Sequence, residues 1–464
     1  MSKLGETGDW VRERLPELLA QHRVPGVAVA FCVGTEVFDT AAGVLSRATG
    51  VEATVDSVFQ IGSITKVWTA TLVMQLADEG KLDLDLPVRT YLPEFRIADE
   101  TAATRITVRQ LMCHTAGFEG DIFTDTGKGD DCVEKYLGVL GDVAQLFEPG
   151  AMFSYNNAGY CVLGRVVEVL RGKPYDECLR EHLFVPLRLT HVAGDPYEAI
   201  LHRAAVGHLQ PTPDAEPRPV PVWALTRSTA PAGAMLAMSP RDLLVFARMH
   251  LSGGIGQEGT VILSETSVDM MRQRQVELPD LGRLGDAWGL GWDIFDTPSG
   301  PVIGHDGGAL GQTAFLRVVP GCDVAVAVLT NGGNSFPLYT EIVVPVLREL
   351  AGVELPALPV PDPRAPRIDA SRYIGTYSSS VSDTVISQDT VGRVWREYIP
   401  KGILVKADAS PTKTELVSWH GEALLPVEPE RGLYLPHAFL GDDGHGRALF
   451  LHTGRADRRA LADR

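Results

Sequence analysis

The stretch Phe59-Gln-Ile-Gly-Ser-Ile-Thr-Lys-Val-Trp68 holds a serine and a lysine three positions apart, at the start of an apolar run with helical spacing. This pattern predicts a helix over residues 63–79, with Gly80 just past its C-terminus. Positions i and i+3 share one face of a helix. The Lys66 amine is therefore predicted to lie beside the Ser63 hydroxyl.

The serine–lysine spacing favours nucleophilic catalysis. A serine hydroxyl attacks only after a base takes its proton, and a lysine is such a base when burial or a positive neighbour lowers its pKa toward neutrality. A dry setting is expected from the apolar neighbours Ile61, Ile64, Val67 and Trp68. The alternative is that Ser63 caps the helix and Lys66 is solvated, although a first-turn lysine opposes the helix dipole.

Predicted strands lie at both ends of the first 350 residues, with helices between them. Residues 27–33 are predicted to form a buried strand and residues 36–42 its hairpin partner, after an amphipathic helix over residues 10–23. Later elements are predicted as helices over 157–171 and from Ser239, and strands over 288–294, 302–304, 314–319 and 324–329. This order predicts an α+β domain whose terminal strands share one antiparallel sheet, with a helical region packed on its face.

A proline-rich segment divides the chain. Five prolines between Leu355 and Pro366 predict a stiff linker over residues 355–367. It separates a domain over residues 1–354 from a second domain over residues 368–464. Six short strands with turn signals between them predict a small β-barrel or sandwich there, over 373–377, 393–398, 402–406, 415–419, 432–435 and 447–452.

Composition and charge narrow the range of partners. The 464 residues are 45% hydrophobic and 22% charged, as in soluble globular proteins. A formal net charge of −17 argues against nucleic acid and anionic membranes as partners. No signal peptide or apolar run of spanning length is recognisable, and the six cysteines lack zinc-like spacing. We expect a cytoplasmic protein with no metal and no membrane partner.

Two further clusters suit a serine nucleophile. In Tyr155-Asn-Asn157, a tyrosine whose pKa is lowered by nearby cations would move protons, and Asn157 would hold the lysine amine or a substrate carbonyl. The alternative is that Asn157 caps the helix and Tyr155 packs. In Gly304-His-Asp-Gly-Gly308, paired glycines allow close backbone approach to a ligand, and His305 is a candidate donor to Tyr155 or to a substrate carboxylate. The alternative there is a simple turn.

The three clusters together resemble the serine β-lactamase and penicillin-binding-protein superfamily, nearest its class C β-lactamase, D-aminopeptidase and esterase branch. The resemblance rests on Ser63-Ile-Thr-Lys66, Tyr155-Asn-Asn157 and His305-Asp-Gly307, in the expected order, and covers roughly residues 10–350. It implies a β-lactamase/transpeptidase-like antiparallel sheet flanked by helices, with a helical subdomain. It also implies no cofactor.

The resemblance implies a role for each matching residue. Ser63 would be the acylated nucleophile, Lys66 its base, Tyr155 the proton shuttle and Asn157 a substrate-positioning residue. Backbone amides of Ser63 and Gly308 would stabilise the oxyanion, and substrate would also contact Asp306 and Gly307. The departure is His305-Asp-Gly where β-lactamases of the superfamily usually carry Lys-Thr-Gly. This weakens the anion site for a β-lactam carboxylate and favours esterase, amidase or acyl-transfer relatives.

The predicted C-terminal barrel resembles the lipocalin-like domains of D-aminopeptidases and of penicillin-binding-protein-type thioesterases. Those thioesterases release or cyclise nonribosomal peptides delivered on a carrier protein, and an arginine of their barrel can reach toward the active site. Arg447 is the candidate here, with a solvated strand-end arginine as the alternative. The acidic stretch 120–131 is predicted to form a loop over the site, and His114 to fix a loop by hydrogen bonds.

The sequence therefore predicts a serine acyl-enzyme hydrolase or acyltransferase acting on an ester, thioester or amide. The more specific expectation is that the enzyme releases a peptide from a thioester or cyclises it. The acyl substrate is expected to be a small molecule or a peptide, either free or bound to a carrier protein. An esterase or D-amino-acid peptidase of the same fold is the alternative within the class. A non-catalytic penicillin-recognising binding protein is the alternative from another class.

Overall fold

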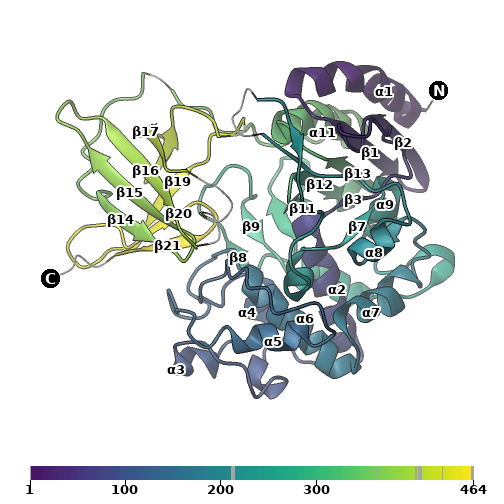
Figure 1. The fold of residues 1–464 in the computed structure, drawn as a ribbon, viewed down its shortest axis with the longest axis horizontal. Coiled ribbons are helices and arrows are strands. Elements are labelled where there is room, and N and C mark those ends of the chain that lie inside the picture. The colour runs from purple at the N-terminus through teal and green to yellow at the C-terminus, as the bar shows by residue number, and fades with distance from the viewer. Residues whose placement is uncertain are drawn as a thin grey trace.

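An eight-stranded antiparallel sheet organises the N-terminal domain of the computed structural model, which describes residues 2–210, 215–362, 364–402, 405, 410–430 and 432–460. The strand order is β2-β1-β13-β12-β11-β10-β9-β8 (Figure 1). The strands are β1 (Gly26–Val33), β2 (Glu36–Gly43), β8 (Val276–Glu277), β9 (Ala287–Trp288), β10 (Asp293–Phe295), β11 (Val302–Ala309), β12 (Gln312–Val319) and β13 (Val324–Thr330).

The terminal strands pair directly. β1 lies antiparallel to β13, with Phe31 opposite Val326, which confirms the predicted joining of the two ends of the domain in one sheet. Alternate residues of β1 enter different cores, because successive strand side chains point to opposite faces. Val27, Val29 and Phe31 lie in one hydrophobic cluster, and Ala28, Ala30 and Cys32 in the other. Burial on both faces explains the unbroken apolar run.

Helices cover both faces of the sheet (Figure 1). On one face, α1 (Lys3–His22) packs beside α11 (Ser335–Ala351). On the other lie α2 (Thr65–Asp78), α6 (Asn157–Arg171) and α9 (Pro240–Leu251). The remaining helices are α3 (Glu100–Ala103), α4 (Val108–Met112), α5 (Cys132–Gly138), α7 (Tyr175–Leu179), α8 (Pro196–Ala199) and α10 (Glu265–Arg272).

Short elements complete this domain. A three-stranded sheet has the order β3-β7-β4, and β5 pairs with β6. These strands are β3 (Phe59–Gln60), β4 (Val192–Ala193), β5 (His208–Leu209), β6 (Arg218–Pro219) and β7 (Ala237–Met238). Single helical turns are η1 (Gly62–Ile64), η2 (Val88–Thr90), η3 (Arg180–Phe184), η4 (Arg227–Ala232), η5 (Gln257–Gly259) and η6 (Pro320–Cys322).

The region around Ser63 differs from the prediction in one detail. Ser63 lies in the turn η1, and α2 begins two residues later with Ile64 as N-cap and no side-chain capping bond. Ser63 is therefore not a helix cap. α2 is buried along most of its length, and Trp68 stacks on Phe246 with ring centroids 3.9 Å apart. The helix ends before Gly80, whose φ of 68° suits its predicted place past the C-terminus.

The C-terminal domain is a closed barrel of eight consecutive antiparallel strands, with β14 paired to β21. Its core contains Tyr377, Ile386, Leu416 and Phe439. The strands are β14 (Gly375–Ser378), β15 (Ser382–Gln388), β16 (Val394–Pro400), β17 (Thr412–Ser418), β18 (Ala423–Pro426), β19 (His437–Leu440), β20 (Phe450–His452) and β21 (Ala456–Arg459). The closed barrel confirms the lipocalin-like prediction over a sandwich.

The prediction of six barrel strands is incomplete. It omits β15, β18, β19 and β21, and residues 432–435 form no strand. The strand predicted over 402–406 falls partly outside the described residues. β15 reads Ser-Asp-Thr-Val-Ile-Ser-Gln, and buries Ser382, Thr384 and Ile386. Such a strand carries a weak hydrophobic signal, because polar side chains face the interior as well as solvent.

The barrel docks on the segment that leads into α6. His452 Nε2 lies 2.8 Å from the Phe153 carbonyl oxygen, and the Tyr155 amide donates to the Gly454 carbonyl at 2.9 Å. The loop between β8 and β9 adds an apolar contact, in which Leu281 packs with Ala423 and Ala438. Figure 1 shows the barrel beside β8 and β9. Across the described ranges, no helix combines the length and apolar character needed to span a bilayer.

Candidate active site

Ser63 and Lys66 form the centre of the site. The Lys66 Nζ lies 3.0 Å from the Ser63 Oγ and donates to the Ala232 carbonyl oxygen at 2.6 Å. The lysine is fully buried, and this burial lowers its pKa from 10.5 to about 7. Because a substantial fraction of such an amine is neutral near pH 7, it can accept the proton of the adjacent hydroxyl.

Apolar and aromatic side chains supply the dry surroundings of the amine. The predicted neighbours Ile61, Ile64 and Val67 are each 0% exposed. The Lys66 Nζ also lies 4.8 Å from the ring centroid of Tyr155 and 5.7 Å from that of Tyr160. When Lys66 is protonated, these rings offer partial compensation through their electron-rich faces. The setting thus favours the neutral amine and still tolerates the cation formed after proton transfer.

Tyr155 lies beside Ser63 and Lys66. A hydrogen bond links it to Ser63, yet burial is the larger effect and raises the pKa of the tyrosine. The predicted lowering of this pKa by nearby cations is therefore wrong, because desolvation outweighs the charge of Arg455. Tyr155 is protonated at neutral pH and can donate a proton to a leaving group.

His114 fixes the backbone next to this tyrosine. Its Nδ1 accepts a hydrogen bond from the Asn156 amide at 3.0 Å, and its ring centroid lies 4.3 Å from that of Tyr155. Burial lowers the pKa of His114 well below its usual value, so the ring is neutral. These contacts confirm the prediction that His114 holds a loop by hydrogen bonds.

The two asparagines of the second motif have different tasks. Asn156 is the N-cap of α6, and its side-chain oxygen accepts a hydrogen bond from the Gly159 amide at 2.7 Å. Asn157, the predicted alternative cap, instead donates from Nδ2 to Asp121 Oδ1 at 2.7 Å. The capping role therefore falls to Asn156, and the Lys66 amine, which bonds Ser63 and Ala232, is not held by Asn157. Asp121 belongs to the acidic stretch predicted to lie over the site.

A barrel arginine reaches the site, but it is Arg455 and not Arg447. Arg455 lies in the turn between β20 and β21, its Nε donates to Asp121 Oδ2 at 2.8 Å, and its guanidinium lies 4.8 Å from the Tyr155 ring centroid. Arg447 instead pairs with Asp443 at 2.8 Å with its side chain 50% exposed. In the sequence, Arg455 follows Thr453-Gly454, a pattern typical of a hairpin turn. The pattern is recognisable as a turn only when the following residues are identified as strand β21.

The third motif lies on β11, where successive side chains alternate between faces. The His305 ring faces Tyr155 and Trp288, with centroids 6.1 Å and 5.4 Å away. Asp306 points to the other face and pairs with buried Arg317 at 2.7 Å. The prediction that the Asp306 carboxylate binds substrate is therefore wrong, because this ion pair holds it on the far side of the sheet.

His305 is a neutral group in this site. Burial and then the charge of Lys66 lower its pKa to about 3. Its Nδ1 lies 2.6 Å from the Asp306 carbonyl oxygen, so Nδ1 carries the proton, and Nε2 has no hydrogen-bond partner among the described residues. The predicted donation to Tyr155 is not present. With the proton on Nδ1, the Nε2 lone pair is free to accept a hydrogen bond.

Backbone contacts between η1 and β11 depend on glycine. A Cβ on Gly307 would lie 1.8 Å from the Ile61 carbonyl oxygen, and one on Gly62 would lie 2.7 Å from the Gly308 amide nitrogen. Close approach of the two segments therefore requires residues without side chains. This approach brings the region of the Ser63 amide next to Gly308, the pair predicted to form the oxyanion hole.

The family model "Beta-lactamase" matches residues 11–342. The chain belongs to the beta-lactamase family. It is accordingly a serine hydrolase.

Known proteins resemble this family member over most or nearly all of its length. Penicillin-binding protein 4 from Amycolatopsis lactamdurans is 44% identical over 369 residues, spanning 79% of this chain and 96% of the relative. The crystal structure of SurE is 29% identical, covers 98% of this chain and 100% of its own, and has a TM-score of 0.78. A second SurE structure, with D-Leu, has the same identity and coverage and a TM-score of 0.75.

A more distant structure shares the catalytic fold. The D-amino acid amidase from Ochrobactrum anthropi SV3, complexed with L-phenylalanine amide, is 24% identical and has a TM-score of 0.63. It covers 75% of this chain and 99% of its own. At this identity the likeness establishes the fold alone.

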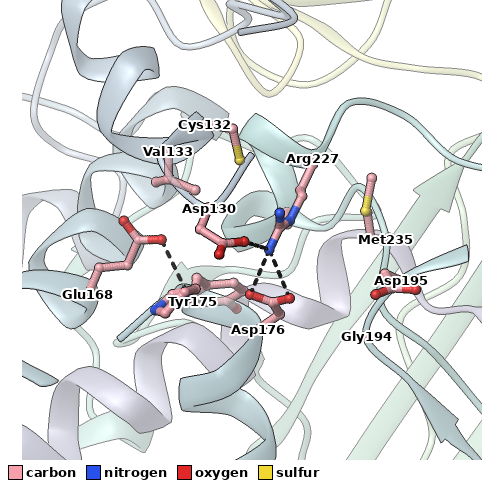
Figure 2. A pocket seen from close by; sticks show the side chains of 12 residues that line it. Asp130, Cys132, Val133, Glu168, Tyr175, Asp176, Gly194, Asp195, Arg227 and Met235 are labelled. Atoms are coloured by element: carbon pink, nitrogen blue, oxygen red, sulfur yellow. Dashed lines mark hydrogen bonds and ion pairs between the residues drawn. The ribbon is translucent and has the colours of Figure 1, made fainter. Parts of the chain in front are cut away.

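A second cluster of charged side chains in this beta-lactamase-family protein has a structural role. Figure 2 shows Arg227 between Asp130 and Asp176, with nitrogen–oxygen distances of 2.9 Å and 3.1 Å. The cavity beside them has a volume of about 10 Å³, room for about one water molecule. The ion pairs join the acidic loop to α7. In the ranges that the structure describes, no group of three or more His, Cys, Asp and Glu side chains is arranged to hold a metal ion.

Proposed function

We propose that this beta-lactamase-family protein transfers a peptidyl acyl group from a thioester or ester to Ser63, and then to water or to an amine, including the amine of the same peptide. The observation that carries the acyl-enzyme part is the buried Lys66 amine 3.0 Å from the Ser63 hydroxyl. No nucleic acid or membrane takes part in this function.

The first half-reaction follows from the placement of three side chains. Neutral Lys66 takes the proton of Ser63 as its Oγ bonds to the substrate carbonyl carbon, and the amides of Ser63 and Gly308 stabilise the oxyanion. The bond to the leaving thiol or alcohol then breaks, and Tyr155 donates a proton to that group. Lys66 returns its proton to Tyr155. The acyl-enzyme remains, with all protons accounted for.

The second half-reaction repeats these proton movements with Ser63 as the leaving group. Water or an amine attacks the ester carbon of the acyl-enzyme as neutral Lys66 takes its proton, Tyr155 donates a proton to Ser63 Oγ as the ester bond breaks, and Lys66 then returns its proton to Tyr155. A buried, largely apolar site disfavours free water relative to an amine held close to the ester. This supports transfer as well as hydrolysis.

The third motif supports acyl transfer over β-lactam hydrolysis. The neutral His305 ring, with a pKa of about 3, presents no positive charge for a β-lactam carboxylate. Asp306 does not take the place of the threonine hydroxyl of Lys-Thr-Gly, because it pairs with Arg317 on the far face of the sheet. The SurE structure with D-Leu, similar over the whole chain, supports a site that accepts a D-amino acid residue.

Recognition of penicillin is the second candidate, favoured by the name of the relative that is 44% identical over 96% of its length. Both functions use an acylated Ser63, but they differ in the fate of the acyl-enzyme. A peptidyl transferase turns over a peptidyl thioester, whereas a penicillin receptor accumulates a long-lived penicilloyl-enzyme. A fluorescent penicillin added with and without excess thioester distinguishes the two by the lifetime of the labelled protein.

The acyl-enzyme is tested by intact mass. A serine-directed phosphonate should add one adduct to the wild type and none to Ser63→Ala, while Ser299→Ala, a change at an exposed serine, should label normally. Labelling that persists in Ser63→Ala would refute the nucleophile assignment. A peptidyl thioester with a free amino terminus then tests transfer. Cyclic product supports cyclisation, and linear acid alone under varied pH and concentration assigns hydrolysis.

A further inference from the structure

A cavity lies where the catalytic domain, the linker and the barrel meet. Its volume is about 110 Å³, and it is lined mainly by aliphatic side chains. The lining includes Leu281 and Arg283 from the loop between β8 and β9, Leu358 from the linker, and Leu433, Tyr434 and Leu435 from the barrel. We name it the junction pocket.

Arg283 places a positive charge at the wall of the junction pocket. Within the described chain, its guanidinium has no hydrogen bond or ion pair with a side chain, and its recorded contact is the face of Phe336 at 5.4 Å. Burial lowers the pKa of Arg283, the charge of Asp306 opposes that effect, and Arg455 adds to it. Asp306 pairs with Arg317 at 2.7 Å and acts on Arg283 through its charge alone. The Arg283 side chain is partly exposed, so a ligand that enters the pocket from solvent can reach its guanidinium.

The pocket is connected to the catalytic centre through neighbouring residues. Leu284, next to Arg283, lies so close to Gly454 that a Cβ there would be 3.0 Å from the leucine Cδ1. Gly454 accepts the hydrogen bond of the Tyr155 amide, and Arg455 covers the Tyr155 ring. A substrate extending from Ser63 past Tyr155 toward the barrel would therefore arrive at this loop.

We propose that the junction pocket binds a short branched aliphatic group that carries a carboxylate, with the carboxylate paired to Arg283. A cavity of about 110 Å³ is smaller than the roughly 150 Å³ that accepts benzene, so the apolar group has about four or five carbon atoms. A planar guanidinium holds a carboxylate through two parallel hydrogen bonds. That this group is the remote end of the acyl substrate rests on the proposed function.

The binding claim is tested with 4-methylpentanoate, and with 4-methylpentanamide as its neutral match, by calorimetric titration of the full chain. The acid should bind at least about tenfold more tightly than the amide, since a hydrogen-bonded charge pair contributes more than about 1.4 kcal/mol. Arg283→Gln should raise the Kd of the acid about tenfold and leave that of the amide unchanged. Arg283→Lys should retain part of the preference. Equal Kd values for acid and amide in the wild type would refute the proposal.

A second pair of variants tests the location without altering Arg283. Val360 lines the pocket yet is 69% exposed, so Val360→Trp fills the pocket at low risk to folding. It should weaken binding of the acid, whereas Val391→Trp, at a barrel position 61% exposed, should not. Unchanged binding in Val360→Trp would place the acid elsewhere and overturn the assignment.

The proposed function and the proposed binding site can be disproved independently of each other. Wild-type protein capped at Ser63 by the phosphonate should bind 4-methylpentanoate as before, because the pocket does not include the nucleophile. Loss of binding on capping would mean that the acid enters the catalytic cleft, and would overturn the separate site. If Ser63 resists the phosphonate while the acid still binds through Arg283, the pocket stands and the acyl-enzyme function falls.

Discussion

At the scale of single residues, the proposed reaction depends on the protonation state of Lys66. A Lys66 pKa of about 7, lowered by burial, means that the active neutral form is lost below pH 7 and dominates above it. We therefore expect kcat/KM to rise with pH through about 7 and then level off. A pH–rate profile with a thioester measures this limb.

The matching variant is Lys66→Ala, which should lower kcat/KM by roughly 10²–10⁴ and remove the rise near pH 7. His305 provides the contrast, because its pKa of about 3 places its titration outside this range. If kcat/KM of Lys66→Ala still rises near pH 7, the rise belongs to the titration of another group.

At the scale of elements, the contact between η1 and β11 requires glycine. A Cβ on Gly307 would lie 1.8 Å from the Ile61 carbonyl oxygen, whereas one on Gly308 meets nothing within 4 Å. We expect Gly307→Ala to lower the unfolding free energy by about 1–3 kcal/mol through overpacking, and Gly308→Ala to have a much smaller effect. Thermal melts of the two variants give the comparison. Equal Tm values would show that η1 and β11 can move apart without a loss of unfolding free energy.

The hairpin of β20 and β21 brings Arg455 to Tyr155, the proton donor in the proposed reaction. Because Arg455 lies 4.8 Å from the Tyr155 ring and pairs with Asp121, Arg455→Ala should reduce kcat/KM about tenfold or more. Arg447→Ala is the matched control, since Arg447 pairs with Asp443 in an exposed turn. Steady-state kinetics with one thioester substrate decides between them. A larger loss in Arg447→Ala would restore the original assignment from the sequence.

At the scale of the whole molecule, Asp121 joins three parts of the fold. Its carboxylate accepts hydrogen bonds from Asn157 at the start of α6 and from Arg455 of the barrel. The Arg455 side chain is 39% exposed, so solvent screens the pair and the loss of global stability in Asp121→Ala should be small. The barrel hairpin should nevertheless open more often.

Hydrogen exchange of residues 450–459 measures that opening. Faster exchange in Asp121→Ala with a nearly unchanged Tm is the expected result, and Asp125→Ala, in the same loop, is the control. Unchanged exchange would mean that the backbone contacts of His452 and Gly454 alone hold the barrel in place.

Much of this architecture was predictable because its signals are local. The apolar run of β1, its two-residue turn into β2, and the helix after Ser63 follow from residue periodicity and turn chemistry. The i, i+3 spacing was enough to predict that Lys66 lies beside Ser63. Barrel strands such as β15 were missed because polar residues face their interior, which removes the alternation that identifies a strand.

The sequence by itself determined the family, the hairpin of β1 and β2 and the serine–lysine pair, since these depend on spacing within short segments. Only the tertiary structure decided that Arg455 rather than Arg447 meets Tyr155, that Asp306 turns away to Arg317, and that burial raises the pKa of Tyr155. The physical reason is that each of these outcomes depends on neighbours far away in the chain. Charge pairing and desolvation are properties of the assembled surroundings and not of the local sequence.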